Sequence, residues 1–389
     1  MYIVLRYSII NKNVLHVEGI SIKKIKEAII SLDIMPRETY DKFSKFSKLQ
    51  NASTDEIWKH YPSTGLNNYD SNKMVIEASI IETYLLINYL RDNNIKARLW
   101  HNNPLFIHND KLFRIRGEEI IEENLENVYF VSMREALSHP FFRILKIILE
   151  KQGGDVVKPN MQTMKNVGCM NKLYAIRELY EKREEYLGDI IIPFNITQRD
   201  HQVFMDYIQK NIGDKIVLKK DCVQEGKGVI FKDLSRDNQM QSISKILNSH
   251  KAKDREVLIS KAYNIQREYR CYFTQHGDEK TVYSIKQRVN SEDIDVYDQE
   301  DITIYKNISV KWHEVKADSD VFEFGVKIAK DILDDLSYDT GCLEFAKTTD
   351  GKIIFFEVNQ MAGPLPFAGE DTQNMTDYYY SIFDNMFKE

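Results

Sequence analysis

The chain alternates short apolar runs with segments of helical periodicity along its 389 residues. In the first part, residues 72–94 form a long amphipathic segment, and the run IKARLW after it predicts a strand. Two alternating runs around Asn109-Asp110 predict a β-hairpin, and VYFVSM predicts a further strand before a helix. This alternation predicts an α/β domain over residues 1–158, in which the polar stretch 51–72 is a loop.

The second part of the chain predicts two further units that mix helices with antiparallel strands. Between residues 159 and 262 we expect helices and short strands, among them KIVLKK, GVIF and EVLISKAY. Between residues 263 and 389 we expect an antiparallel pair of strands, a helix and a closing hairpin over 341–360. The predicted fold class is therefore α/β in the first domain and α+β in the two subdomains that follow.

The closing hairpin brings polar side chains to one face of an otherwise apolar segment. Asp350-Gly351 is a strong signal for a two-residue turn of type I′, which would pair Thr349 with Lys352. That register places Glu344 directly opposite Glu357, with Asn359 on the same face two residues further along. The opposite face is expected to pack on a core through its apolar residues, Leu343, Phe345, Ile354, Phe356 and Val358.

Two carboxylates directly opposite each other repel, because their Cβ atoms lie only about 5 Å apart. A hard divalent cation removes this repulsion. Mg²⁺ takes oxygen ligands from one or two carboxylates and completes its shell with water and substrate phosphates. Glu344, Glu357 and Asn359 are therefore candidate metal ligands, and the hairpin by itself leaves a solvated polar face as the alternative.

Composition limits the classes of partner. The 53 basic and 59 acidic residues give a formal charge of -6, which provides no electrostatic footprint for nucleic acid. No apolar run approaches the ~20 residues of a membrane span. The 4 cysteines are isolated, which is typical of free thiols in a reducing compartment. We expect a cytoplasmic protein with neither a nucleic-acid nor a membrane partner.

A second group of candidate residues lies where IVLKKDCVQEGKGVIF turns. Lys219 ends a strand, and Gly226 and Gly228 follow in a turn where backbone N–H groups can approach phosphate oxygens. Alternation places Lys219 and Lys220 on opposite faces, and we expect Lys219 to face the ligand. The glycines alone leave open an ordinary hairpin turn.

The order of these segments resembles the ATP-grasp superfamily. Lys219 precedes the two glycines by seven and nine residues, and VLISKAYNIQREYR, YSIKQR, CLEFA and IIFFEVN follow in that order. The resemblance covers residues 160–383 and is greatest to the carboxylate-amine ligases, which include glutathione synthetase, D-alanine:D-alanine ligase and the ribosomal-protein glutamate ligases. It implies a pre-ATP-grasp domain over 1–158 and two subdomains, 159–262 and 263–389, that grip ATP between antiparallel sheets.

The resemblance also implies roles in binding the nucleotide. Lys172 and Lys219 would contact the α- and β-phosphates of ATP. The backbone of LISKAY, at Lys261 and Ala262, would recognise adenine. Glu268 would hold the ribose hydroxyls, a task that suits a carboxylate because it accepts two hydrogen bonds.

The catalytic candidates are implied in the same way. The γ-phosphate and the acyl group would be received by Arg270, Lys286 and Arg288, for which surface ion pairing is the alternative. The three candidate metal ligands would hold two Mg²⁺ ions, with Glu357 bridging them.

The implied reaction is the ATP-dependent joining of a carboxylate and an amine through an acylphosphate, with release of ADP and phosphate. The carboxylate donor and amine acceptor are either small molecules or peptides. Two alternatives stay open: a phosphotransferase that phosphorylates a hydroxyl, and an ATP-binding protein without turnover.

Overall fold

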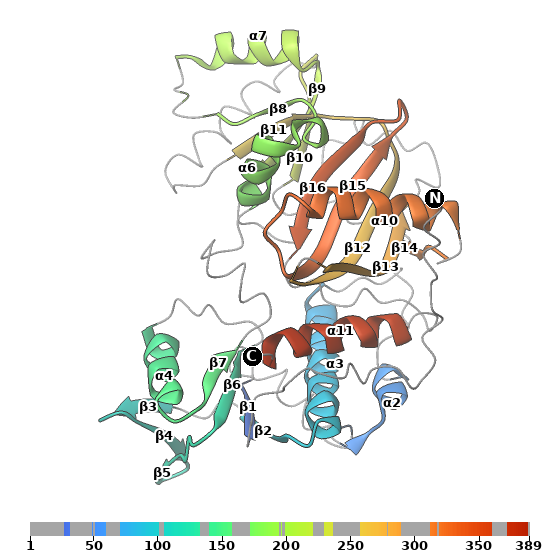
Figure 1. Ribbon diagram of the computed structural model, residues 1–389. Coiled ribbons are helices and arrows are strands. Elements are labelled where there is room, and N and C mark those ends of the chain that lie inside the picture. Colours follow the sequence, from blue (N-terminus) through green and yellow to red (C-terminus); the bar gives the residue numbers. More distant parts are fainter. Residues whose placement is uncertain are drawn as a thin grey trace.

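A computed structural model describes the greater part of the chain (Figure 1). The described residues are 27–31, 49, 51–59, 71–100, 105–132, 140–157, 172–193, 196, 199–220, 229–235, 257–277, 279–288, 312–316, 319–359 and 372–387. In Figure 1 the N-terminal domain lies at the bottom, a small lobe that contains α7 (His201–Asn211) lies at the top, and a five-stranded sheet lies between them. The predicted opening strand, the helix 240–249 and the acidic run 291–301 lie outside the described residues.

The N-terminal domain is built on a parallel sheet, as the alternating pattern predicts. Its strand order is β2-β1-β6-β7, and every neighbouring pair is parallel. The strands are β1 (Glu27–Ser31), β2 (Lys96–Trp100), β6 (Val128–Ser132) and β7 (Asp155–Val157). The helices of this domain are α2 (Thr54–Lys59), α3 (Ser71–Asp92) and α4 (Pro140–Glu150).

The stretch 51–72 is not wholly a loop, because α2 forms within it. A capping box begins this helix: the Glu56 carboxylate accepts from the Ser53 amide at 2.8 Å, and Ser53 Oγ accepts from the Glu56 amide at 3.3 Å. Trp58 is buried and donates to Thr376 Oγ1 at 2.8 Å. The Ser-x-x-Glu spacing is a sequence signal for the start of this helix, and the polar composition of the stretch led to the prediction of a loop instead.

A small antiparallel sheet projects from this domain in the order β3-β4-β5. Its strands are β3 (Leu105–His108), β4 (Lys111–Arg116) and β5 (Glu119–Glu122). The predicted hairpin is confirmed, and Asn109 and Asp110 both have positive φ, 47° and 58°, as a type I′ turn requires. The buried carboxylate of Glu123 binds Arg98 of β2 at 2.5 Å and Arg114 of β4 at 2.6 Å, and so ties the two sheets together.

Helix α3 is buried more completely than an amphipathic helix would be. Residues 81–90 are buried on every side. The reason is α11 (Thr372–Phe387), a helix that was not predicted and that packs against α3. Tyr89 donates to Asp384 at 2.7 Å, and Tyr379 donates to Glu82 at 3.1 Å. Because α11 also contacts β12 and β13, one core joins the N-terminal domain to the five-stranded sheet.

The five-stranded sheet is antiparallel and has the order β14-β13-β12-β15-β16. Its strands are β12 (Ile265–His276), β13 (Glu279–Arg288), β14 (Trp312–Glu314), β15 (Thr340–Thr348) and β16 (Ile353–Asn359). Helix α10 (Asp320–Leu333) covers one face. Gly325 permits this close packing, since a Cβ there would lie 2.7 Å from Ile285 Cδ1.

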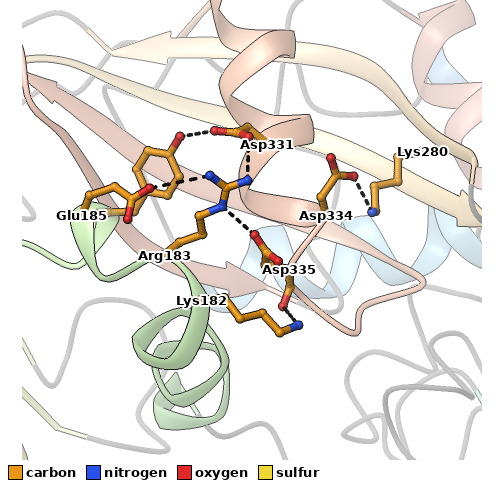
Figure 2. Close-up of polar contacts among 8 residues, drawn as sticks. Lys182, Arg183, Glu185, Lys280, Asp331, Asp334 and Asp335 are labelled. Carbon is orange, nitrogen blue, oxygen red and sulfur yellow. Dashed lines mark hydrogen bonds and ion pairs between the residues drawn. The ribbon is translucent and has the colours of Figure 1, made fainter.

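Helix α6 (Lys172–Lys182) and the short 3-10 helix η3 (Glu184–Tyr186) pack into the same core as α10. Figure 2 shows how Arg183 fastens them to the end of α10: its Nε lies 2.6 Å from Asp335, and its Nη2 lies 3.2 Å from Asp331. The Glu178 carboxylate accepts from the amide and the hydroxyl of Ser337. Although α6 precedes the small lobe in the chain, it is therefore fixed to the five-stranded sheet.

The small lobe contains a second antiparallel sheet, in the order β10-β9-β11-β8. Its strands are β8 (Ile190–Ile191), β9 (Lys215–Lys220), β10 (Val229–Asp233) and β11 (Val257–Lys261). Helix α7 (His201–Asn211) covers one face, where Met205 and Ile208 pack on Ile216 and Leu218. The other face of this sheet lies towards the five-stranded sheet, whose core includes Leu258 of β11.

Two further expectations concern the chain as a whole. Cys271 and Cys342 are buried free thiols, as predicted, while Cys169 and Cys222 lie outside the described residues. In the part of the chain that the structure describes, every helix is too short or too polar to cross a membrane.

Candidate active site

The β15–β16 hairpin places Glu344 opposite Glu357 and Cys342 opposite Asn359, as the sequence predicts. The turn that produces this register differs from the prediction. The amide of Thr348, rather than that of Thr349, pairs with Lys352, donating to its carbonyl at 2.9 Å. Residues 349–351 thus form a three-residue loop, in which Gly351 has φ 87°.

A β-bulge between the loop and the two carboxylates restores the predicted pairing of β15 with β16. Phe345 pairs with Phe355 whereas Glu344 pairs with Glu357, so Phe356 is an extra residue on β16. The longer loop shifts the pairing by one residue, and the bulge shifts it back. The predicted register at the carboxylates is therefore right although the predicted turn is wrong.

The bulge also reverses which apolar residues of β16 face the core. Phe355 is only 4% exposed and packs with Leu343 and Phe345 behind the sheet. Ile354 and Phe356 were predicted there, but the structure places them on the carboxylate face. Continuous apolar character along IIFFEV gives no phase signal from which this could be predicted.

Four charged residues on adjacent strands form one row across the sheet. Lys286 of β13 lies opposite Arg270 of β12. Arg270 lies opposite Glu344 of β15, which lies opposite Glu357 of β16. Side chains directly opposite each other share a face, so this charged row (Lys286, Arg270, Glu344 and Glu357) gathers predicted catalytic and metal-binding residues on one surface.

Arg270 supplies a positive charge to the carboxylate pair, and Asn359 donates hydrogen bonds to both of its members. Arg270 Nη2 lies 2.8 Å from Glu344 Oε1. Asn359 Nδ2 donates to Glu344 at 2.6 Å and to Glu357 at 3.1 Å. Burial is the largest single influence on the pKa of Arg270 and lowers it, but the surrounding groups, Glu344 foremost and Glu357 among them, together raise this pKa, so the guanidinium stays charged. A metal ion is therefore not the sole counter-charge of the pair.

Lys286 and Glu268, a catalytic and a nucleotide-binding candidate, lie on the same face of the sheet as Arg270. Lys286 is 0% exposed. Glu268 is half-buried and lies opposite Arg288 on one side and Ala346 on the other, one row from the charged row. The side chain of Arg288 lies outside the described residues, so only its strand position is established.

Lys219 points from the small lobe towards the five-stranded sheet. Its neighbours Ile216 and Leu218 are buried against α7, which leaves Lys219 on the opposite face of β9. Lys219 Nζ lies 4.7 Å from the centroid of the Phe356 ring. Leu258, directly opposite Lys219, packs into the core of the five-stranded sheet. The side chains of Lys172 and Lys220, and both Gly226 and Gly228, lie outside the described residues.

The segment predicted to recognise adenine joins the two lobes. The amide of Lys261 donates to the Asp189 carbonyl at 3.0 Å, and that of Ala262 donates to the Lys215 carbonyl at 2.9 Å. Lys261 Nζ lies 3.9 Å from the Asp189 carboxylate. Both amides thus bind other parts of the chain in this structure.

The donor set fits Mg²⁺ bound together with a phosphate ligand. Among the described residues, no group of three His, Cys, Asp or Glu side chains could hold a metal ion. Glu344 and Glu357 instead offer a pair of carboxylates, and Asn359 would add an amide oxygen on turning its Oδ1 to the ion in place of the Nδ2 that binds both carboxylates here. Mg²⁺ commonly uses one or two carboxylates and takes its remaining ligands from water and phosphates.

The fold can be compared with known proteins. Neither the protein-family models nor the curated proteins give a match. D-alanyl-alanine synthetase A from Vibrio cholerae O1 biovar eltor str. N16961 has a solved structure that is similar to the chain with a TM-score of 0.53 and 11% identity, over 93% of this chain and 98% of that one. The chain therefore has the ATP-grasp fold.

Other ATP-grasp structures give lower scores. The VanG D-Ala:D-Ser ligase from Enterococcus faecalis has a TM-score of 0.49 at 16% identity, over 94% of this chain and 98% of its own. A RiPP-associated ATP-grasp ligase from Chryseobacterium gregarium has a TM-score of 0.47 at 13% identity, over 93% of this chain and 96% of its own.

Proposed function

We propose that the protein is an ATP-dependent carboxylate-amine ligase that forms an amide or peptide bond. The observation that carries this proposal is the charged row, which sets two carboxylates and two cations side by side across from Lys219. Such a surface can bind a metal-bound triphosphate at one end and an anionic acyl group at the other. The ATP-grasp fold supports the same function.

In this proposal the phosphates bind between the two lobes. Lys219 and Lys172, with the turn at Gly226 and Gly228, bind the phosphate oxygens. Glu344, Glu357 and Asn359 would hold the Mg²⁺ that accompanies ATP. When bound, Mg²⁺ neutralises the charge that develops on the transferring phosphoryl group. The LISKAY segment and Glu268 bind the nucleoside.

The reaction then proceeds in two steps. The substrate carboxylate attacks the γ-phosphorus of ATP, and ADP leaves, which gives an acylphosphate. The amine attacks the acyl carbon, loses a proton, and expels inorganic phosphate. Arg270, Lys286 and Arg288 stabilise the negative charge on the acyl and phosphoryl oxygens, so positioning and charge neutralisation supply the catalysis.

Because the reaction consumes ATP and the two described cysteines are free thiols, we place it in the cytoplasm.

The reaction class can be tested with purified protein, Mg²⁺, ATP and pools of amino acids and short peptides. Release of ADP and phosphate, with a product lighter by one water than the two substrates combined, supports the ligase. A product that retains the phosphoryl group would instead identify a phosphotransferase. A thermal shift with Mg²⁺-ATP but no turnover in any pool would indicate a binding protein.

The nucleotide site can be tested through Lys219 and Lys220, the last two residues of β9. Lys219→Ala should weaken ATP binding and leave the fold intact. Lys210→Ala, on the exposed side of α7, serves as the matched control and should leave ATP binding unchanged. Weaker ATP binding in Lys220→Ala but not in Lys219→Ala would contradict the proposed face.

A further inference from the structure

The bulge in β16 gives the carboxylate face an aromatic ring. Phe356 and Glu357 are consecutive, yet the bulge directs both towards the small lobe, whereas Phe355 enters the core. Phe356 is half-buried rather than sealed in the interior. Bulges re-aim side chains next to active sites, and here the re-aimed side chain is Phe356.

The ring of Phe356 meets a charged group from the other lobe. Lys219 Nζ lies 4.7 Å from the ring centroid, within the ~6 Å over which an ammonium is attracted by the face of an aromatic ring. Lys219 belongs to β9 of the small lobe and Phe356 to β16 of the five-stranded sheet. The contact thus places a flexible cation at a defined point beside Glu357.

A lysine side chain with four rotatable bonds loses conformational entropy when it is fixed on a phosphate. A group that already holds the ammonium near its working position reduces this loss. The Phe356 ring can do this without neutralising the charge, which a carboxylate partner would do. The ring therefore holds the Lys219 ammonium near the charged row and itself neutralises none of its charge.

We propose that Phe356 is a positioning residue, whose ring holds the Lys219 ammonium beside the charged row before the nucleotide binds. The contact itself is a property of the nucleotide-free protein. Its consequence for phosphate binding rests on the proposed function. The ring acts through Lys219, so removing Lys219 removes its effect.

The first test needs no nucleotide. The rate at which a water-soluble N-hydroxysuccinimide ester acylates each lysine is followed by mass spectrometry in the wild type and in Phe356→Leu. Loss of the ring should speed acylation of Lys219 about two- to fivefold. Lys347, whose Nζ lies over the Phe324 ring at 5.3 Å, and Lys210 on α7 are internal controls that should not change. An unchanged rate at Lys219 would overturn the proposal.

The second test measures the Kd of Mg²⁺-ATP in a double-mutant cycle. Phe356→Leu should raise the Kd about two- to fivefold, and Phe356→Tyr, which keeps the ring, should restore it. In a Lys219→Met background, Phe356→Leu should have no further effect. A full effect of Phe356→Leu in that background would mean that the ring contacts the nucleotide itself, which overturns the positioning role. If the wild type binds no nucleotide, the proposed function fails, while the acylation test still decides whether the ring holds Lys219.

Discussion

Two of the hairpins of this protein, β3–β4 and β15–β16, were predicted from the same kind of sequence signal, yet only one of them folds in the simplest way. In the β3–β4 hairpin, Asn109 and Asp110 form the predicted two-residue turn, and pairing runs without interruption. In the β15–β16 hairpin, Gly351 closes a three-residue loop and a bulge follows. The regular hairpin carries no candidate chemistry, whereas the irregular one carries the carboxylates. Departures from the simplest pairing occur where a strand must present particular side chains.

The largest effect on stability should separate the two phenylalanines at the bulge. Phe355→Ala should lower the free energy of unfolding by about 3–5 kcal/mol, because it leaves a cavity in the core. Phe356→Ala should cost only about 1 kcal/mol, because its ring is half-buried between the lobes. Urea unfolding followed by fluorescence measures both. If Phe356→Ala is the more damaging, the bulge is not where the structure places it.

An intermediate effect is expected at Arg270, which has no counterpart in the regular hairpin. Arg270→Met removes the partner of Glu344 and leaves the two carboxylates facing each other. Because both side chains are partly exposed, at 25% and 13%, we expect a loss of about 1–3 kcal/mol. Adding Glu344→Gln to Arg270→Met should recover part of this loss in thermal unfolding without nucleotide. A double variant no more stable than Arg270→Met would contradict the charge argument.

The smallest effect should come from the turn. Gly351→Ala should cost about 1 kcal/mol, because φ is 87° there although nothing lies within 4 Å of the new Cβ. Asn109→Ala in the regular hairpin, where φ is 47°, is the matched comparison and should cost a similar amount. Thermal unfolding of both variants is the measurement. A much larger loss in Gly351→Ala would mean that the turn, rather than the bulge, fixes the register at the carboxylates.

Much of the fold was predictable because its signals are local. The type I′ turn at Asn109-Asp110 and the burial of Ile216 and Leu218 follow from residue type and alternation. The bulge was not predictable, since Phe355 and Phe356 are identical residues and only packing against the rest of the sheet decides which one enters the core. Helix α11 received no prediction, and its aromatic residues are buried because α3 and the strands β12 and β13 lie against them.

The candidate site was predictable where it lies within one hairpin. The pairing of Glu344 with Glu357 follows from the hairpin alone. The pairing of Arg270 with Glu344 depends on which strand lies next to β15, and the approach of Lys219 depends on how two lobes meet. Neither fact is encoded in a local pattern, so the sequence predicted these residues but not their contacts.

The central claim is that the irregular hairpin holds Mg²⁺ for ATP through Glu357. The direct test is ATP consumption by Glu357→Gln as a function of Mg²⁺, once a substrate pool that supports turnover is known. Glu122→Gln on β5, an exposed carboxylate of the N-terminal domain, is the matched control. Glu357→Gln should abolish turnover while the melting temperature without nucleotide stays unchanged, because glutamine still accepts from Asn359. Full activity of Glu357→Gln with the wild-type Mg²⁺ dependence would contradict the account.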